Sequence, residues 1–313
     1  GCAAGCAAGC AAGCAAGLES KWKKHGKPPR RRPRRKWTEK RKAKNDANRK
    51  KLIEKREKLR ITKYRRVTKM QINANKRKEI EASKKLVSIS ELEGSVFFHR
   101  KCTSLKEAIL KNSGIIAEFK RKSPSKGIIN DVVKPSEVAK GYSDAGVSAI
   151  SCLTDTDYFG GTFQDLMDVR NVVDIPVLRK DFMLDEYQLI EAKSIGADVI
   201  LLIASSLSIK ETHQLSKSAK DLGLNVLLEI HDNDELDHIN EYCDAVGVNN
   251  RNLKTFEVNI DVSKRLSNQI PDDFIKVSES GISSIDAIQE LKTYGFTGFL
   301  IGENFMKTEN PGK

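Results

Sequence analysis

Short apolar runs alternate along most of the chain with longer segments in which apolar residues recur every three or four positions. The runs lie at 115–119, 149–153, 176–178, 199–203, 226–230, 245–248, 274–277 and 298–301. Helical patterns lie between most of them, at 136–145, 163–173, 185–195, 208–222, 232–242, 261–267 and 283–294. Continuous short apolar runs are typical of buried parallel strands, and strands that alternate with helices predict a parallel sheet.

Eight such strands predict an α/β fold, the TIM (β/α)8 barrel of the phosphate-binding type. The barrel proper covers about 104–308, and an amphipathic helical extension at 76–92 precedes it within a domain of residues 70–313. A doubly wound open sheet is the alternative. That fold usually has a glycine-rich phosphate loop after its first strand, and the sequence has none there.

The segments before residue 70 have a different composition. Residues 1–17 repeat Gly-Cys-Ala-Ala, a low-complexity pattern that cannot build a core. Residues 18–69 carry 25 basic and 5 acidic side chains, whereas the formal charge of the whole chain is +13, so the rest is mildly acidic. We expect a basic arm that is disordered or partly helical. Such an arm permits nonspecific nucleic-acid contact, with Trp22, Trp37 and Tyr64 available for base stacking.

Cysteine usage and hydropathy indicate a cytoplasmic protein. Four of the seven cysteines lie in the repeat, and Cys102, Cys152 and Cys243 are widely spaced, which predicts free thiols and no metal site. No apolar run reaches the ~18 residues that would span a bilayer, and no signal peptide is evident.

Charged residues lie at the carboxyl ends of alternate predicted strands. By the two-residue period of a strand, Glu118 and Lys120 share a face with an apolar residue of the first strand, as do Lys180, Glu229 and Glu279 in the third, fifth and seventh. The sixth strand ends in Asn249. In a barrel, alternate strands contribute to the same interior layers, so these groups should converge at one mouth. An active site is one interpretation, and a structural salt-bridge network is the other.

Two glycine-containing turns predict an anion site. Ser280 and Gly281 follow the seventh strand, and Gly302 and Glu303 follow the eighth. The loops after these strands commonly bind phosphate through backbone N–H groups, although ordinary tight turns have the same composition. The cationic loop after the first strand places Ser123 where it could donate a hydrogen bond to the ligand.

Six segments together resemble the indole-3-glycerol-phosphate synthase family, over about residues 74–312. They are 116–125 (IAEFKRKSPS), 177–182 (VLRKDF), 228–230 (LEI), 247–253 (GVNNRNL), 277–282 (VSESGI) and 300–302 (LIG). The resemblance implies a carbon–carbon lyase of tryptophan biosynthesis. Its substrate would be 1-(2-carboxyphenylamino)-1-deoxyribulose 5-phosphate, which is closed to a ring, decarboxylated and dehydrated. No metal and no organic cofactor is implied.

The resemblance also implies roles for the charged residues. Lys180 matches the general acid, and Lys120 matches a lysine that contacts the carboxylate or phosphate of the substrate and assists proton transfer. Glu229 matches the general base of dehydration. Glu118 and Asn249 match residues that orient hydroxyls and lysines, and Glu279 and Ser280 complete the polar floor. The sequence leaves open how acid and base duties divide between the two lysines.

The chain departs from the family pattern at three places. The sequence given stops soon after Pro311, where the family continues into a last helix, so we expect that helix to be missing and an apolar face to be bare. The arm has no counterpart in the family. His231 faces the mouth by strand parity, and we interpret it as a turn or helix-start residue.

Three rival interpretations stay open at this point. A phosphoribosylanthranilate isomerase would share the barrel and the phosphate grip, but that family uses a Cys/Asp pair where this chain has Glu118 and Lys120. A nucleic-acid-binding protein would use the basic arm, with the barrel as a passenger. An inactive barrel fragment would follow from the missing helix. The sequence makes no prediction of oligomeric state.

Overall fold

The computed structural model describes residues 48–49, 51, 69–124, 126–252 and 257–312. The chain divides into two compact units, Gly1–Lys58 and Leu59–Lys313. In the first unit Asn48, Arg49 and Lys51 are described, and Asn48 and Arg49 are helical and exposed. The predictions for the repeat at 1–17 and for nearly all of the basic arm at 18–69 lie outside the described residues.

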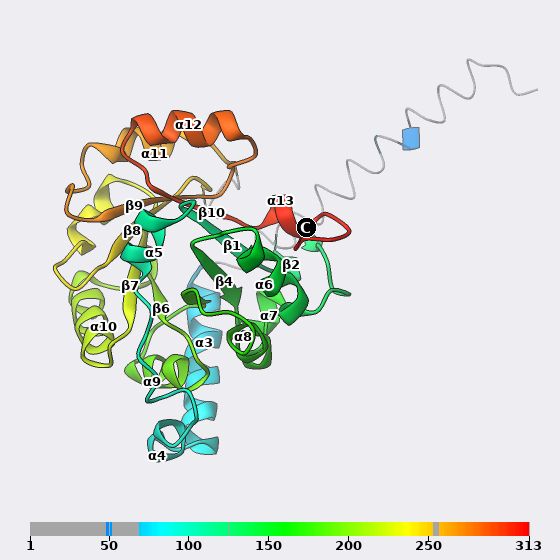
Figure 1. Cartoon of the computed structure of the whole chain (residues 1–313). Coiled ribbons are helices and arrows are strands. Elements are labelled where there is room, and N and C mark those ends of the chain that lie inside the picture. The colour runs from blue at the N-terminus through cyan, green and yellow to red at the C-terminus, as the bar shows by residue number, and fades with distance from the viewer. Residues whose placement is uncertain (1–47, 50, 52–68, 125, 253–256, 313) are drawn as a thin grey trace, which may run out of the picture. The chain divides into compact units, whose positions relative to one another are not determined.

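Eight parallel strands close into a barrel in the second unit (Figure 1). The strands are β1 (Ile115–Phe119), β4 (Ala149–Leu153), β5 (Val177–Lys180), β6 (Val199–Ile203), β7 (Asn225–Ile230), β8 (Ala245–Asn249), β9 (Ile275–Glu279) and β10 (Gly298–Ile301). Each pairs with its neighbours in chain order, and β10 pairs with β1 to close the ring. The predicted TIM barrel is therefore confirmed, and the open sheet is excluded. A hairpin of β2 (Lys122–Ser123) and β3 (Gly127–Ile128) follows β1.

Helices surround the strands, and most begin at a side-chain cap. They are α6 (Pro135–Asp144), α7 (Thr156–Phe159), α8 (Phe163–Arg170), α9 (Glu186–Ser194), α10 (Ile209–Asp221), α11 (Asp261–Ser267), α12 (Ile285–Thr293) and α13 (Glu303–Met306). Thr162 and Ser208 each form a capping box with an acidic residue three positions on, which satisfies backbone N–H groups at the start of α8 and α10.

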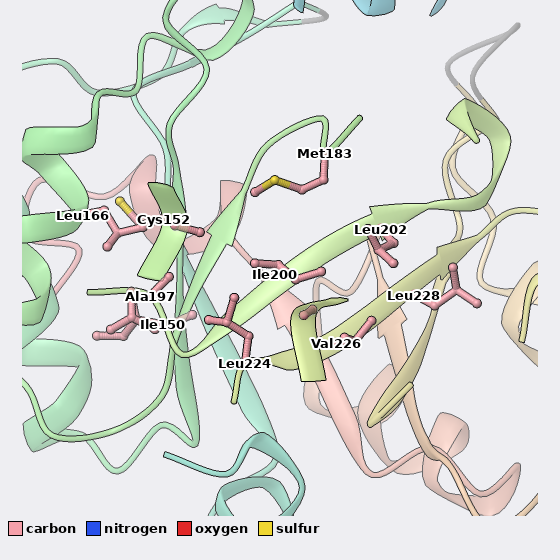
Figure 2. Close-up of a cluster of buried hydrophobic side chains, with 14 of the residues drawn as sticks. Ile150, Cys152, Leu166, Met183, Ala197, Ile200, Leu202, Leu224, Val226 and Leu228 are labelled. Carbon is pink, nitrogen blue, oxygen red and sulfur yellow. The ribbon is translucent and has the colours of Figure 1, made fainter. Parts of the chain in front are cut away.

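Two apolar layers build the core. The inner layer fills the barrel with the alternate residues that the sequence assigns to the interior, among them Ile116, Leu178, Leu227 and Val277. The outer layer lies between strands and helices, and Figure 2 shows part of it, including Ile150, Leu166, Ile200, Leu202, Val226 and Leu228. The strands are thus buried on both sides, which explains why they appear in the sequence as continuous apolar runs.

The amino-terminal mouth of the barrel is closed by α5 (Leu105–Lys111), whose Leu105 and Ile109 join the inner layer. A buried polar cluster holds this end. Asp198 accepts hydrogen bonds from Arg100 at 2.7 Å and from Arg170 at 2.6 Å, so its buried charge is paired. Asn225 accepts from the N–H of Leu105 at 3.1 Å. These polar contacts are structural, because they lie at the end opposite the charged strand ends.

The predicted helical extension at 76–92 consists of two helices. Helix α3 (Lys69–Leu86) ends before Ser88, and α4 (Ile89–Glu93) begins there because Ser88 and Glu91 form a capping box. Helix α3 is tied to the carboxyl side of the strands by Lys76, a buried lysine that lies 2.9 Å from Asp155 and 2.9 Å from Asp181. The extension is therefore fixed beside the ends of β4 and β5.

The prediction of a helix over residues 232–242 was wrong. A short 3-10 helix, η2 (Asn233–His238), occupies its start. The side chain of Asp232 caps η2, and Asn240 accepts the N–H of Tyr242 in a turn that replaces further helix.

The predicted bare apolar face is also absent from the described part of β10. Phe299 and Ile301 face outward from that strand and are buried, and α13 packs against the neighbouring β1. The segment after α13 then returns to α6, where a Cβ on Gly141 would lie 2.1 Å from the carbonyl oxygen of Gly312. This close backbone approach requires glycine at position 141.

Among the described helices, none combines the length and the apolar character that a bilayer crossing needs.

Candidate active site

The charged residues predicted from strand parity lie inside the carboxyl-terminal mouth. Glu118, Lys180, Glu229 and Glu279 each stand at or next to the end of β1, β5, β7 and β9. The three glutamates are at most 4% exposed. Buried charges are costly unless they are paired, so their partners decide what this site can do.

Lys180 joins two of the three glutamates. Its Nζ lies 2.7 Å from Glu279 Oε2 and 3.4 Å from Glu229 Oε2. Burial would lower the pKa of Lys180, but the carboxylates of Glu279, Glu229 and Glu118 outweigh burial and raise it above its ordinary value. Lys180 is therefore a charged ammonium at neutral pH, held in one place and able to donate a proton to a ligand oxygen.

Glu229 and Glu279 have opposite pKa shifts. Burial raises the pKa of Glu279 to about 7, with Glu229 adding to the effect and Lys180 opposing it. Burial acts on Glu229 in the same sense, but Lys180 and His231 outweigh it and hold its pKa below the ordinary value. Near neutral pH the pair thus contains a carboxylate at Glu229 and a partly protonated Glu279. Two carboxyl groups with separated pKa values suit one base and one acid.

Glu118 and Lys120, at the end of β1, form a second ion pair at the mouth. The ammonium of Lys120 contacts Glu118 Oε1. Burial would raise the pKa of Glu118, but Lys120 and Lys180 lower it below its ordinary value. Glycine at position 302, after β10, makes room for this carboxylate, because a Cβ there would lie 2.5 Å from Glu118 Oε1. Glu118 is thus an ionised group between two lysines.

Two asparagines, Asn249 and Asn250, lie at the end of β8 and contact neighbouring parts of the site. The side-chain amide of Asn249 helps to lower the pKa of Glu229, and its Oδ1 accepts the N–H of Arg251 at 3.0 Å. Asn250 is buried, and its Nδ2 donates to Ser278 Oγ at 2.9 Å and to the carbonyl of Ser280 at 3.2 Å. Asn250 therefore holds the loop after β9 in place.

The loop after β9 has an unusual backbone. Ser280 has φ +68° and Gly281 φ +76°, both in the left-handed region. Ser280 is the one non-glycine residue with positive φ in the described chain, and such strain often marks a functional site. A Cβ on Gly281 would lie 2.2 Å from Val258, so this position requires glycine both for its φ and for its packing.

The remaining predicted ligand residues lie in the neighbouring loops. Gly302 precedes the short helix α13, in which Glu303 is the first residue. The carboxylate of Glu303 is directed to Lys126, 3.5 Å away in the loop after β1. Ser123 lies in the hairpin after β1, where its hydroxyl accepts the N–H of Lys126 at 3.2 Å. A hydroxyl can accept and donate at the same time, so the predicted donation from Ser123 to a ligand stays a prediction.

Several buried polar atoms near this mouth have no hydrogen-bond partner within the described chain. They are Asn73 Oδ1 on α3, the hydroxyls of Ser205 and Ser206 after β6, His231 Nε2 after β7 and Glu279 Oε1. Buried polar groups are normally satisfied, so a concentration of unpaired ones is typical of a place where a polar ligand binds. Strand parity placed His231 at the mouth, but no sequence signal indicated Asn73 or the two serines.

The described residues contain no group of three or more His, Cys, Asp and Glu side chains arranged to hold a metal ion. The three cysteines in this part of the chain, Cys102, Cys152 and Cys243, are free thiols. Burial raises the pKa of Cys152 and that of Cys243, so neither is an activated nucleophile. The chemistry of the mouth therefore rests on lysine and glutamate.

This arrangement defines a β/α-barrel enzyme with acid–base groups at the carboxyl ends of its strands. The family model for indole-3-glycerol phosphate synthase matches residues 69–313. The chain belongs to that family, and it is a ring-closing, decarboxylating lyase.

Individual relatives agree with this assignment. An indole-3-glycerol phosphate synthase of Bacteroides thetaiotaomicron is 49% identical over 244 residues, which cover 78% of this chain and 94% of the relative. One from Carboxydothermus hydrogenoformans is 44% identical over 222 residues, covering 69% and 84%. The barrel is also similar to N-acetylmannosamine-6-phosphate 2-epimerase of Clostridium perfringens, with TM-score 0.50 and 12% identity over 66% of this chain and 92% of that one. That likeness concerns the fold alone.

Proposed function

We propose that the chain converts 1-(2-carboxyphenylamino)-1-deoxyribulose 5-phosphate to indole-3-glycerol phosphate, carbon dioxide and water. The observation that carries the proposal is the position of Lys180 between Glu279 and Glu229, at the mouth of a barrel of this family. A fixed ammonium beside two carboxyl groups of different pKa supplies the acid and the base that ring closure and dehydration need.

The first step forms the carbon–carbon bond. The aromatic carbon that bears the carboxylate attacks the ribulose carbonyl carbon, and the carbonyl oxygen takes a proton as its double bond becomes a single bond. Lys180 donates this proton, since its raised pKa keeps it charged until the oxygen gains negative character. Loss of carbon dioxide then returns the bonding electrons to the ring and restores its aromaticity, so the enzyme contributes position and protons.

The last step removes water. Glu229 takes the proton from the ring being formed, and the hydroxyl group leaves as water after it receives a proton. The side-chain amide of Asn249 favours the carboxylate form of Glu229 and is proposed to orient it. Glu279 is partly protonated near neutral pH, which fits a role beside the leaving hydroxyl. Lys120, paired with Glu118, contacts the carboxylate or the phosphate of the substrate and assists a later proton transfer.

The phosphate binds to backbone N–H groups of Ser280, Gly281, Gly302 and Glu303. Support comes from the left-handed backbone at Ser280 and Gly281, and from the pairing of β9 with β10, which puts both loops at one edge. The Glu303 carboxylate is directed to Lys126, which leaves only its N–H for an anion. Ser123 would donate its hydroxyl hydrogen to the ligand while its oxygen accepts the N–H of Lys126.

The proposal needs no metal and no organic cofactor, and free thiols fit the cytoplasmic location expected from the sequence. The test is incubation of the purified full-length chain with the carboxyphenylamino-deoxyribulose phosphate after dialysis against a chelator. We expect indole-3-glycerol phosphate and carbon dioxide in equal amounts. A folded chain that forms neither, or that only isomerises N-(5-phosphoribosyl)anthranilate, would defeat the proposal. Nucleic-acid contact by residues 18–69 stays a prediction from charge.

A further inference from the structure

The imidazole of His231 lies between two carboxylates at the end of β7. Its Nε2 is 3.4 Å from Glu229 Oε1, and its Nδ1 is 3.3 Å from Glu235 Oε2. The side chain is 11% exposed. Nε2 is fully buried, and among the described residues it makes no hydrogen bond, so the polar group that it approaches is Glu229.

Glu235 fixes the orientation of this ring. The Glu235 carboxylate accepts the backbone N–H of His231 at 2.7 Å with the same oxygen that faces Nδ1. Glu235 lies in η2, whose first turn is capped by Asp232, so the carboxylate is held by local structure. A histidine whose Nδ1 faces a carboxylate presents Nε2 to its other neighbour, here Glu229.

The two oxygens of Glu229 thus have different partners. Oε2 faces Lys180 and Oε1 faces His231. Lys180 is shared with Glu279 and is the proposed proton donor, so it becomes neutral when it delivers its proton. At that moment His231 is the cationic group still beside Glu229.

We propose that His231 is a positioning residue, which holds Glu229 Oε1 and, as an imidazolium, keeps Glu229 in its carboxylate form. This inference rests on the proposed function for the role of Glu229 as the base. The groups that face the imidazole are Glu229 from β7, Glu235 from η2 and, farther away, Glu279 from β9. Burial would lower the pKa of His231, but these carboxylates outweigh it and raise the pKa above the ordinary value.

The test compares His231→Asn and Glu235→Gln with His213→Asn. His213 is a matched control, because it also faces a glutamate, Glu241 at 3.5 Å, but lies half-exposed on α10 away from the mouth. In the pH profile of kcat for indole-3-glycerol phosphate formation, we expect the acid limb of His231→Asn to move to higher pH by about one unit. Glu229 stays ionised at pH 7 in this variant, so its kcat at that pH falls about 10-fold because the carboxylate loses the contact that positions Oε1, with KM within about 2-fold of wild type.

Glu235→Gln should move the acid limb in the same direction by less, whereas His213→Asn should match wild type. If the acid limbs of His231→Asn and Glu235→Gln both coincide with that of His213→Asn, the inference is overturned. If His231→Asn does not fold, Glu235→Gln decides, because it removes only the charge that holds the ring.

A second readout does not depend on turnover. An NMR titration of the His231 ring should give a lower pKa in Glu229→Gln and in Glu235→Gln than in wild type. An unchanged ring pKa in both variants would overturn the inference even in an active enzyme. A wild-type chain that forms no product but shows the expected ring titration would instead defeat the proposed function and leave the His231–Glu229 pairing supported.

Discussion

Gly247 lies against the carboxyl group of Glu279, and a Cβ at position 247 would be 2.3 Å from Glu279 Oε1. The two residues stand on the adjacent strands β8 and β9, both facing the barrel interior. A methyl group would therefore push the carboxyl group away from Lys180. We expect Gly247→Ala to lower kcat by about 10-fold or more, since small displacements of reacting groups are costly. Steady-state kinetics of indole-3-glycerol phosphate formation measure this.

Gly298→Ala is the matched control for that substitution. Gly298 also faces the interior, and a Cβ there would lie 2.7 Å from Cγ2 of Val277, an apolar contact. Overpacking should cost about 1–3 kcal/mol of stability. The kcat of the folded fraction should nevertheless stay near wild type. Equal losses of kcat in the two alanine variants would show that the position of Glu279 is not what matters.

Replacing Lys180 by methionine tests the proposed acid. The substitution removes the ammonium that contacts Glu279 and Glu229, and with it the proposed proton donor to the carbonyl oxygen. We expect kcat to fall by about 10³-fold or more. Circular dichroism should show the barrel intact, because the carboxyl groups can take up protons in place of the lost charge.

The control for Lys180→Met is Lys276→Met. Lys276 stands on β9 and is also largely buried, but its Nζ faces outward, 3.0 Å from the carbonyl of Ser267 and 2.8 Å from Asp272. Its loss should affect stability and not kcat. Turnover of Lys180→Met within a few-fold of Lys276→Met would remove Lys180 from the mechanism.

The strand positions and the inward-facing residues could be predicted because both follow from short-range rules. An apolar run of three to five residues and a two-residue period place Lys180, Glu229 and Glu279 inside the mouth without knowledge of any contact. The barrel order follows because alternating strands and helices wind in one direction. The charged ring of the site was therefore already contained in the sequence pattern.

Other features depend on contacts between distant segments, which a linear pattern does not contain. Asn73 reaches the carbonyl of Ser206, 133 positions away, and nothing near Asn73 in the sequence indicates this. Helix α5 was not predicted. Its apolar residues Leu105 and Ile109 are explained only by their packing inside the barrel, which the linear sequence does not show. His231 was interpreted as a turn residue, and its backbone does start a turn, but its ring also meets Glu229.

The pH dependence of stability tests the ionisation of Glu279. Its pKa in the native state is about 7, against 4.5 for an ordinary glutamate, so between these values the native state binds more protons than the unfolded state. Stability contributed by Glu279 is therefore fully present below pH 4.5 and is lost as the pH rises to about 7. Glutamine does not titrate.

We accordingly expect the free energy of unfolding of wild type, minus that of Glu279→Gln, to fall by on the order of 3 kcal/mol across this window. Urea unfolding at several pH values measures the difference. A difference that stays constant, or that rises with pH, would mean that Glu279 is ionised throughout and that Glu229 and Glu279 do not form an acid and base pair.

The last prediction concerns Lys76, which ties helix α3 to the active-site side of the barrel. Its side chain is 5% exposed and lies 2.9 Å from Asp155 and from Asp181. Lys76→Met would leave two buried carboxylates without this partner, so we expect a loss of about 3–5 kcal/mol in stability. Amide hydrogen exchange along α3 should become faster. Because Asp181 directly follows Lys180, kcat should fall as well.

Lys78→Met, on an exposed position of the same helix, keeps the helix composition comparable and should leave stability, exchange along α3 and kcat unchanged. If Lys76→Met matches Lys78→Met in stability and in exchange along α3, the ion pairs do not hold the helix. If stability falls but exchange along α3 and kcat do not change, Lys76 supports the ends of β4 and β5 without coupling α3 to the site. Only the combined loss of protection and kcat shows that docking of α3 helps to keep Lys180 in place.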